Sequence, residues 1–259
     1  PTVLNSKYVY YWLKTKYDLI NRGTRGSAIP HVDRKLLQDL FVPAPSLEVQ
    51  VRIISILERA ERLQQKREQA NQLTNKIIQS VFLKMFGDPN QGLSNFIRKT
   101  LDDLVENLDS KRVPLNEEQR SKRRGDIPYY GASGLVDWID DYIFDEPLLL
   151  VAEDGENLRS RKLPIAYSIS GKSWVNNHAH VLRCVGINQR FLESWFNLLD
   201  ISPHLGGSTR PKLNKTTLMA IDVPVPPESL QLKFAETIDK IMGMKYHQEQ
   251  STQEINELF

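Results

Sequence analysis

One segment of this chain occurs twice. Residues Gly26–Gln50 align with Gly207–Gln231 at a constant offset of 181 residues and without a gap, and eight of the 25 aligned positions are identical. Each copy is followed by a long, charged segment with helical spacing of its apolar residues. A repeat of this size indicates that the chain performs one task in two places, which constrains both its fold and its function.

The composition fits an ordinary globular protein. With 259 residues, 40% hydrophobic and 25% charged, the chain can form one or two domains with a core. No apolar run approaches the roughly 20 residues needed to span a bilayer, and no targeting peptide is visible. Cys184 is the only cysteine, which excludes an internal disulfide. We therefore expect a cytoplasmic protein without a membrane segment.

The net charge does not identify a binding partner. The net charge is +2, so any basic surface for nucleic acid must be local.

Proline, glycine and apolar spacing divide the chain into four predicted parts. Residues 1–45 have the character of the C-terminal tail of a domain, ending in the stiff Phe41–Pro45 segment. Residues 46–90 form a first long helix and its end, with Ser46 as N-cap and a Gly87–Pro89 stop. Residues 91–226 form a complete domain, and residues 227–259 form a second long helix.

Both predicted helices carry apolar heptads. In the first, the two seams contain Ile53, Ala60, Arg67, Thr74 and Val81, and Ile56, Leu63, Ala70 and Ile77. In the second they contain Phe234, Ile241, Gln248 and Ile255, and Ile238, Lys245, Thr252 and Phe259. This pattern favours an antiparallel coiled coil between the two helices. An ordinary bundle core is an equally open alternative from periodicity alone.

The segment between the helices mixes short strands with helices. Strand-like runs include Leu148–Ala152, Ile165–Ile169 and His180–Val185, and residues 191–199 have helical spacing. Turn residues recur between them, at Gly131, Gly134 and Gly171 among others. The fold class is therefore α+β: a mixed α/β domain with long α-helices packed as an antiparallel coiled coil.

No catalytic or metal constellation is complete. His178 and His180 lie two apart, but no second cysteine or carboxylate–histidine set completes a zinc site. Ser133 lacks the Gly-x-Ser-x-Gly pattern of a nucleophile elbow. The acidic turn around Asp154 is more often a loop after a buried strand than a metal site. We expect no catalytic residue, no metal and no cofactor in this chain.

Basic, amide and aromatic residues instead gather in loops. Such side chains bind phosphates and the edges of bases. The candidate DNA contacts are Arg123, Arg124, Tyr129, Tyr130, Ser133, Lys172, Trp174, Asn176, Asn177, His178, Thr209, Arg210 and Lys212. A solvated, salt-bridged surface is the alternative, because acidic residues flank these loops. For Trp174 and Tyr130, a place in the core is the alternative.

Several motifs in one order resemble a known family. They are Ile127–Gly134, Ala152–Leu158, Gly171–His180, Pro211–Asn214, Val223–Pro227 and the helix end Phe82–Pro89. The chain resembles, over essentially its whole length, the specificity (S) subunit of type I restriction–modification systems. The two repeated segments then look like the exits from two recognition domains into spacer helices.

The resemblance implies a non-catalytic reader of double-stranded DNA. Such subunits carry two target recognition domains, each reading half of a split sequence, held apart by long helices. Two methyltransferase (M) subunits dock on them, bind S-adenosylmethionine and methylate adenine N6. Endonuclease/translocase (R) subunits join and use ATP with Mg²⁺. This chain departs from that pattern, because only the tail of a first domain precedes its complete one. Truncation of a longer protein and pairing of half-length chains are the two explanations, and we favour truncation.

Two other functions remain open. One is a coiled-coil scaffold or interaction protein whose globular domain binds protein. The more distant one is an enzyme that works through His178, His180 and Asp154. The sequence does not specify the DNA target.

Overall fold

The computed structural model describes residues 3–22, 34–91, 95–207 and 209–257, and the chain forms two compact units. The N-terminal unit is Pro1–Leu73 and the C-terminal unit is Thr74–Phe259. The division falls inside the longest helix. The four parts predicted from the sequence, with boundaries at residues 45, 90 and 226, stay a prediction.

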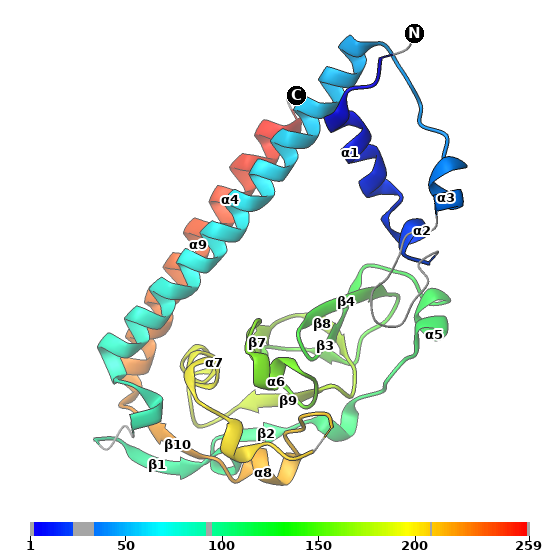
Figure 1. The fold of residues 1–259 in the computed structure, drawn as a ribbon. Coiled ribbons are helices and arrows are strands. Elements are labelled where there is room, and N and C mark those ends of the chain that lie inside the picture. Colours follow the sequence, from blue (N-terminus) through cyan, green and yellow to red (C-terminus); the bar gives the residue numbers. More distant parts are fainter. Residues whose placement is uncertain (1–2, 23–33, 92–94, 208, 258–259) are drawn as a thin grey trace. The chain divides into compact units, whose positions relative to one another are not determined.

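Helices make up most of the N-terminal unit, and a long helix closes the C-terminal unit (Figure 1). They are α1 (Ser6–Thr15), α2 (Tyr17–Arg22), α3 (Arg34–Gln38), α4 (Leu47–Phe86), α5 (Glu117–Ser121), α6 (Asn157–Ser160), α7 (Gln189–Leu198), α8 (Lys215–Met219) and α9 (Glu228–Glu257). Short 3-10 turns are η1 (Pro89–Gln91), η2 (Leu101–Asp103), η3 (Asp109–Lys111) and η4 (Ser202–His204).

The strands that the structure describes lie in the C-terminal unit. They are β1 (Ile97–Thr100), β2 (Val105–Asn107), β3 (Ile127–Gly131), β4 (Gly134–Ile139), β5 (Phe144–Asp145), β6 (Leu148–Ala152), β7 (Ala166–Ile169), β8 (Lys172–Val175), β9 (Ala179–Cys184) and β10 (Asp222–Val225). They form sheets of order β1-β10, β2-β9-β6-β7 and β4-β3-β8-β5. This mixture of irregular sheets and helices confirms the predicted α+β class.

Strand β6 lies at the centre of the fold. All five of its residues are buried, which explains the continuous apolar run Leu148–Ala152. Leu149 and Val151 belong to the main core, which also contains side chains of α7. Leu148 and Leu150 point to the opposite side and pack with Phe144 of β5 and Val175 of β8. Because side chains alternate along a strand, one strand joins the helical layer to the second sheet.

The end of α4 packs against the start of α9. Phe82 is fully buried, with ring centroids 4.9 Å from Phe86 and 5.6 Å from Phe234. Ile78 and Val81 pack against the same core, which includes Ile238 of α9. Asn75 and Met242, further from this end on each helix, line one cavity. The helices therefore run antiparallel within this unit, as predicted.

The predicted seam of α4 is only partly correct. Val81 packs on the core as expected, but Ile77 is 50% exposed, and its neighbour Ile78 takes the inward position. Ile77 and Ile78 are adjacent apolar residues, and the heptad was assigned to the one that does not face the core. On α9, Phe234, Ile238 and Ile241 all belong to the core or pack on it, as predicted.

The duplication extends beyond the repeat seen in the sequence. Helices α1 and α7 both contain ten residues and begin after an asparagine N-cap. The side chain of Asn5 accepts a hydrogen bond from the Lys7 N–H, and that of Asn188 accepts one from the Arg190 N–H. Each helix also forms an ion pair with the long helix of its own unit: Lys7 with Glu58, and Arg190 with Asp239.

A buried glutamine connects each pair of helices. Gln50 donates to the Pro45 carbonyl at 2.8 Å and accepts from the Asn5 N–H at 2.8 Å. Gln231 is also buried and makes the same two bonds, to the carbonyl five residues before it and to the N-cap of α7. A buried amide needs such partners. The two units therefore share a helix-pair framework, although residues 26–33 of the first repeat lie outside the described residues.

In the described part of the chain, no helix is both long and apolar enough to cross a membrane.

Candidate nucleic-acid interface

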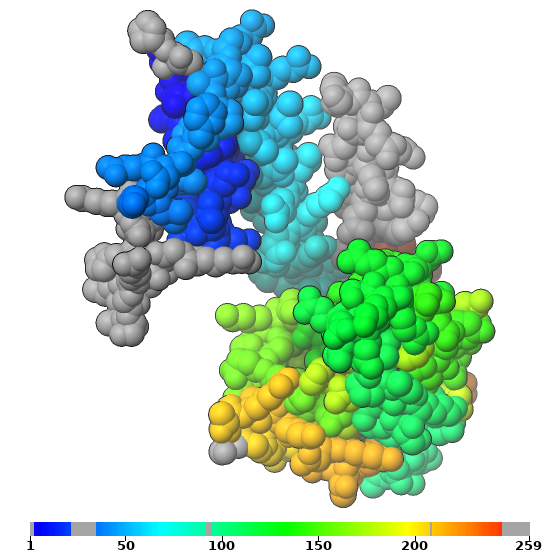
Figure 2. Space-filling model, turned by 90° about the vertical axis from the view of Figure 1, so that its right-hand side faces the viewer, coloured from blue at the N-terminus to red at the C-terminus, as the bar shows by residue number. Residues whose placement is uncertain are grey.

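Three loops of the C-terminal unit meet at the ends of β6 and β9. We call residues 153–155, 176–178 and 209–213 the loop junction. Backbone hydrogen bonds connect all three: Glu153 N–H donates to the His178 carbonyl at 2.8 Å, and Leu213 N–H donates to the Glu153 carbonyl at 2.8 Å. In the space-filling view the orange segment after Gly207 lies beside the green strand-bearing segments (Figure 2). Three of the motifs that carry the family resemblance therefore lie in one place.

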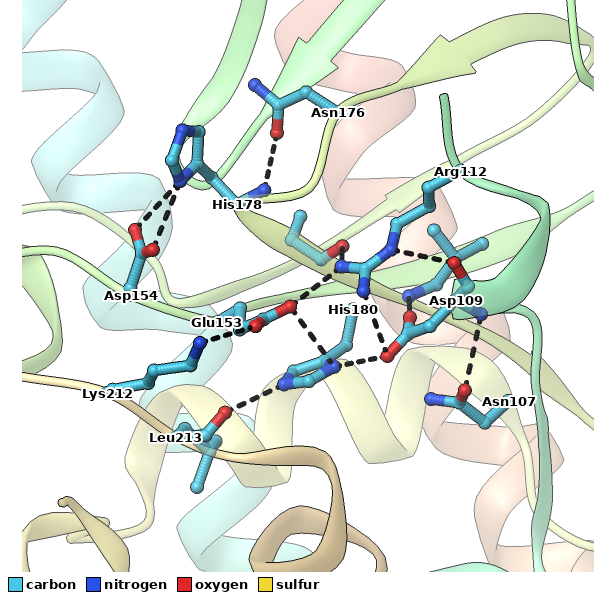
Figure 3. A network of polar contacts seen from close by, with 12 residues as sticks. Asn107, Asp109, Arg112, Glu153, Asp154, Asn176, His178, His180, Lys212 and Leu213 are labelled. Carbon is cyan, nitrogen blue, oxygen red and sulfur yellow. Dashed lines mark hydrogen bonds and ion pairs between the residues drawn. The ribbon is translucent and has the colours of Figure 1, made fainter. Parts of the chain in front are cut away.

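Asp154 binds two exposed side chains at this junction. Its carboxylate lies 3.0 Å from Nδ1 of His178 and 2.6 Å from Nη2 of Arg210 (Figure 3 shows the histidine contact). Asp154 is 15% exposed, whereas the side chains of His178 and Arg210 are 42% and 62% exposed. One carboxylate, shielded from solvent, thus holds two nitrogen-bearing side chains at the surface.

An ionic network, buried except for Lys212, connects the junction to η3 and β9. It consists of Asp109, Arg112, Glu153, His180 and Lys212 (Figure 3). Arg112 Nη1 donates to Glu153 Oε2 at 2.8 Å, and Lys212 Nζ lies 3.1 Å from Glu153 Oε1. Asp109 Oδ1 accepts from the Val181 N–H at 2.8 Å. The network ties η3, β9 and the two loops together across more than 100 residues of sequence.

His180 is the centre of this network. Its ring is 1% exposed, with Nδ1 at 2.6 Å from Asp109 Oδ2 and Nε2 at 2.8 Å from the Leu213 carbonyl. Both nitrogens lie within hydrogen-bond distance of an oxygen acceptor, so the ring connects η3 to the loop at Leu213. Burial opposes the charge of Asp109, but the His180 contacts and the Val181 N–H outweigh it and lower the pKa of this carboxyl.

Asp109, Glu153 and His180 also have the geometry of a possible metal site. One ligand atom from each lies within 4.8 Å of the others. However, the guanidinium of Arg112 and the ammonium of Lys212 already bind Glu153, and His180 binds Asp109. Arg112 and Lys212 supply two positive charges for the two carboxylates, so the network is balanced without a metal ion. His178 and His180 bind different carboxylates and do not share one ligand set.

The remaining candidates of the junction differ in exposure. Lys212 is 47% exposed beyond its contact with Glu153. Asn177 and Thr209 are exposed. Asn176 has a structural role, because its side-chain carbonyl accepts from the His178 N–H at 2.8 Å and closes the turn. The structure thus brings six of the 13 predicted residues to one junction: Asn176, Asn177, His178, Thr209, Arg210 and Lys212.

Two aromatic candidates lie in the interior. Tyr129 is 1% exposed, and its hydroxyl contacts the backbone of Leu115. Trp174 is 6% exposed and donates from Nε1 to the Val113 carbonyl at 2.6 Å. Neither side chain reaches the surface, so their assignment as DNA contacts was wrong. Each belongs to a satisfied core of the second sheet.

The other predicted residues lie outside the junction. Arg123 stacks 4.8 Å from the Trp174 ring and forms ion pairs with Asp140 and Asp141, so acidic neighbours already balance its charge. The other residues of this set are Arg124, Tyr130, Ser133 and Lys172. Arg124, Ser133 and Lys172 are exposed, and Tyr130 is half-buried, with burial raising the pKa of its hydroxyl.

A glycine brings the β3–β4 hairpin close to the junction. A Cβ atom on Gly131 would lie 3.1 Å from the Nδ2 atom of Asn176 and 2.8 Å from a methyl group of Val136. Only a residue without a side chain permits this approach without displacement of its neighbours. Ser133, in the turn after Gly131, therefore follows a segment packed against the junction.

Two residues of the network were missed from the sequence. Asp109 and Arg112 precede their partners Glu153 and His180 by 41 to 71 residues. In sequence they form part of an ordinary charged stretch, and no local pattern marks them. Asp154 was named as part of an acidic turn and in the enzyme alternative, but not as a partner of Arg210.

A family model described as "Type I restriction modification DNA specificity domain" matches residues 2–75 and 94–257. The chain therefore belongs to this family. The two matched segments include the two framework copies, α1 with the start of α4 and α7 with α9.

Known relatives agree with this membership. A Haemophilus influenzae protein, predicted to be the type I restriction enzyme specificity subunit S.HindORF215P, is 33% identical over 56% of this chain. The MjaIX specificity subunit of Methanocaldococcus jannaschii is 23% identical over 91% of it. These matches cover 37% and 62% of those proteins, so the chain spans only part of their length.

The fold also has a solved counterpart. The S subunit of a type I restriction–modification system from M. genitalium aligns with 98% of this chain and 71% of its own, with a TM-score of 0.58 and 17% identity. At this identity the likeness concerns the fold.

Proposed function

We propose that this chain is a DNA-recognition part of a type I restriction–modification complex, which reads one half of a bipartite double-stranded target. The observation that carries the proposal is the loop junction. At this junction the side chains of Arg210, Lys212 and His178 are exposed together. Membership of the family adds to this support. Arginine and lysine bind phosphates and guanine edges, and histidine can donate to or accept from a base edge.

The distribution of charge supports a reader that works with partners. The whole chain carries only +2, and many arginines outside the junction are paired with carboxylates. We propose that docked M subunits supply a large share of the phosphate contacts. In the same proposal those subunits bind S-adenosylmethionine and methylate adenine N6, and R subunits use ATP with Mg²⁺. This chain then positions the chemistry without performing it, in the cytoplasm where the target DNA lies.

A methylome comparison tests the function. N6-methyladenine is mapped in cells that carry the intact gene and in cells that lack it. We expect that one split sequence motif loses its methylation in the deletion strain. Reintroduction of the gene should restore methylation of that motif. An unchanged methylome would contradict the proposal and favour the alternative of a protein-binding scaffold.

Arg210→Ala tests the junction itself. We expect the assembled complex to bind its mapped target about 5- to 150-fold more weakly, because a correct base contact discriminates by about 1–3 kcal/mol. The measurement is equilibrium DNA binding over a range of salt concentrations. Arg98→Ala is the matched control, since Arg98 also pairs with an aspartate, Asp222, but in the β1-β10 sheet. Unchanged affinity and salt slope would remove Arg210 from the interface.

A further inference from the structure

Asp154 occupies a chemically unexpected place for a DNA-binding surface. Phosphates repel carboxylates, so a carboxylate among basic residues weakens non-specific binding. Yet Asp154 lies between Arg210 and His178 and contacts both within 3.1 Å. It is the least exposed member of the three. Attraction to the DNA backbone therefore does not explain why a carboxylate lies at this position.

The backbone fixes the position of Asp154. It follows β6, whose five residues are all buried, and it forms an antiparallel bridge with Lys212. Gly155, the next residue, has a φ of 116° and donates its N–H to the Pro211 carbonyl at 3.1 Å. A side chain at that φ would be strained, so glycine permits this tight turn. The carboxylate is thus anchored to the segment that carries Arg210.

The contacts with Asp154 determine what its two neighbours can offer to DNA. Arginine has five N–H donors in a rigid fork, and the Asp154 contact engages Nη2 of Arg210, which leaves other donors for a guanine edge. His178 directs Nδ1 to the carboxylate. In the neutral ring this contact places the hydrogen on Nδ1 and leaves Nε2 as an acceptor for an adenine or cytosine amino group.

We propose that Asp154 is a positioning residue that orients Arg210 and His178 for reading base edges. This inference rests on the proposed function. In this proposal the carboxylate lowers the affinity for unrelated DNA through charge repulsion, and it raises the affinity for the target by holding the two side chains in place. Fixing two long side chains before binding reduces the conformational entropy that they lose in the complex.

Two explanations of Asp154 predict opposite results. If Asp154 only neutralises charge, its removal strengthens binding to every DNA sequence by the same factor. If it orients the two readers, its removal strengthens or preserves binding to unrelated DNA while binding to the target weakens. The ratio of the two affinities therefore separates the explanations, whereas a single affinity does not.

The test uses the assembled complex with Asp154→Ala and Asp154→Asn. The probes are a duplex with the mapped methylation target and the same duplex with the scrambled half-site. For Asp154→Ala we expect the affinity ratio to fall about tenfold or more, within the range of a lost base contact. Asp154→Asn keeps an oxygen acceptor for His178 but loses the charge that holds Arg210, so its ratio should fall by less than that of Asp154→Ala but by more than about twofold.

Controls keep the outcome interpretable. Asp222→Ala also removes a carboxylate paired with an arginine, but in the β1-β10 sheet, and should leave the ratio unchanged. Retained binding to scrambled DNA shows that a variant is folded. If Asp154→Ala does not fold, the near-isosteric Asp154→Asn decides, and a ratio within twofold of wild type overturns the inference. If the wild type itself shows no preference between the duplexes, the proposed function fails instead.

Discussion

Replacement of Asp109 by alanine is expected to lower the free energy of unfolding of the C-terminal unit by about 3–5 kcal/mol, the range for removing one partner of a buried ion pair. The variant leaves the ring of His180, 1% exposed, without its carboxylate partner, leaves Arg112 with one carboxylate fewer, and leaves the Val181 N–H without its acceptor. Equilibrium chemical denaturation measures the change. Asp145→Ala removes an exposed carboxylate from β5 and should change stability by less than about 0.5 kcal/mol.

The same carboxylate gives a pH dependence with a definite sign. Burial acts to raise its pKa, but the contacts with His180 more than offset burial and hold the folded-state pKa below the unfolded value of about 3.9. Such a group stabilises the fold above the unfolded pKa, and this contribution disappears as the pH falls through the folded pKa. Wild type should therefore lose stability below about pH 4 more steeply than Asp109→Ala. Parallel pH profiles of the two proteins, or a loss below about 1 kcal/mol at neutral pH, would contradict the role of the network.

Phe82→Ala is expected to have a comparable effect through packing alone. Phe82 is fully buried between α4, α7 and α9, with ring centroids 5.5 Å from Phe191 and 5.6 Å from Phe234. Truncation of such a phenylalanine removes aromatic contacts and leaves a cavity, which destabilises by about 3–5 kcal/mol. Chemical denaturation followed by circular dichroism and tryptophan fluorescence measures it, since Trp195 lies in the same core.

The matched control lies on the same helix. Ile77 is 50% exposed, so Ile77→Ala should cost well under about 1 kcal/mol, although the heptad pattern assigns it to the seam. A similar loss from both substitutions would mean that α4 packs on its predicted heptad side. A small loss from Phe82→Ala would mean that the junction of the three helices is not part of the stable core.

Local patterns were sufficient for most of the fold. The apolar run at residues 148–152 became β6, and the periodic segments at 46–86 and 228–259 became α4 and α9. These predictions succeed because burial on both sides of a strand, or on one side of a helix, produces a recognisable pattern of apolar residues along the sequence. The phase of the α4 seam was wrong at this point, because Ile77 and Ile78 are adjacent apolar residues and only packing selects between them.

The wider duplication was not visible in the sequence. Asn5 and Asn188 are 183 residues apart, whereas Gln50 and Gln231 are 181 apart, so no single gapless offset aligns both. Few positions of α1 and α7 are identical. What both copies retain is a set of contacts: an N-cap, a buried amide and an ion pair. Different residues can make the same contact, as Lys7 and Arg190 do.

Part of the candidate nucleic-acid interface could be predicted from the sequence. Exposed basic and amide residues of Gly171–His180 and Pro211–Asn214 were found from their loop positions, and the structure places them at one junction. The error at Tyr129 and Trp174 arose because an aromatic side chain in a strand can point inward as readily as outward. Asp109 was missed, and the contact of Asp154 with Arg210 was not foreseen, because the partners of both carboxylates are distant in sequence.

The pairing of β1 with β10 has a consequence for how this architecture can change. Ile97 and Val225 are cross-strand partners, so the chain enters and leaves the intervening segment at neighbouring points, about 5 Å apart. A different domain whose two chain ends lie at this spacing could be inserted here with little loss of conformational entropy. The two long helices would keep their present attachment points. The segment between β1 and β10 could therefore be replaced by another domain without a change in the packing of the two helices.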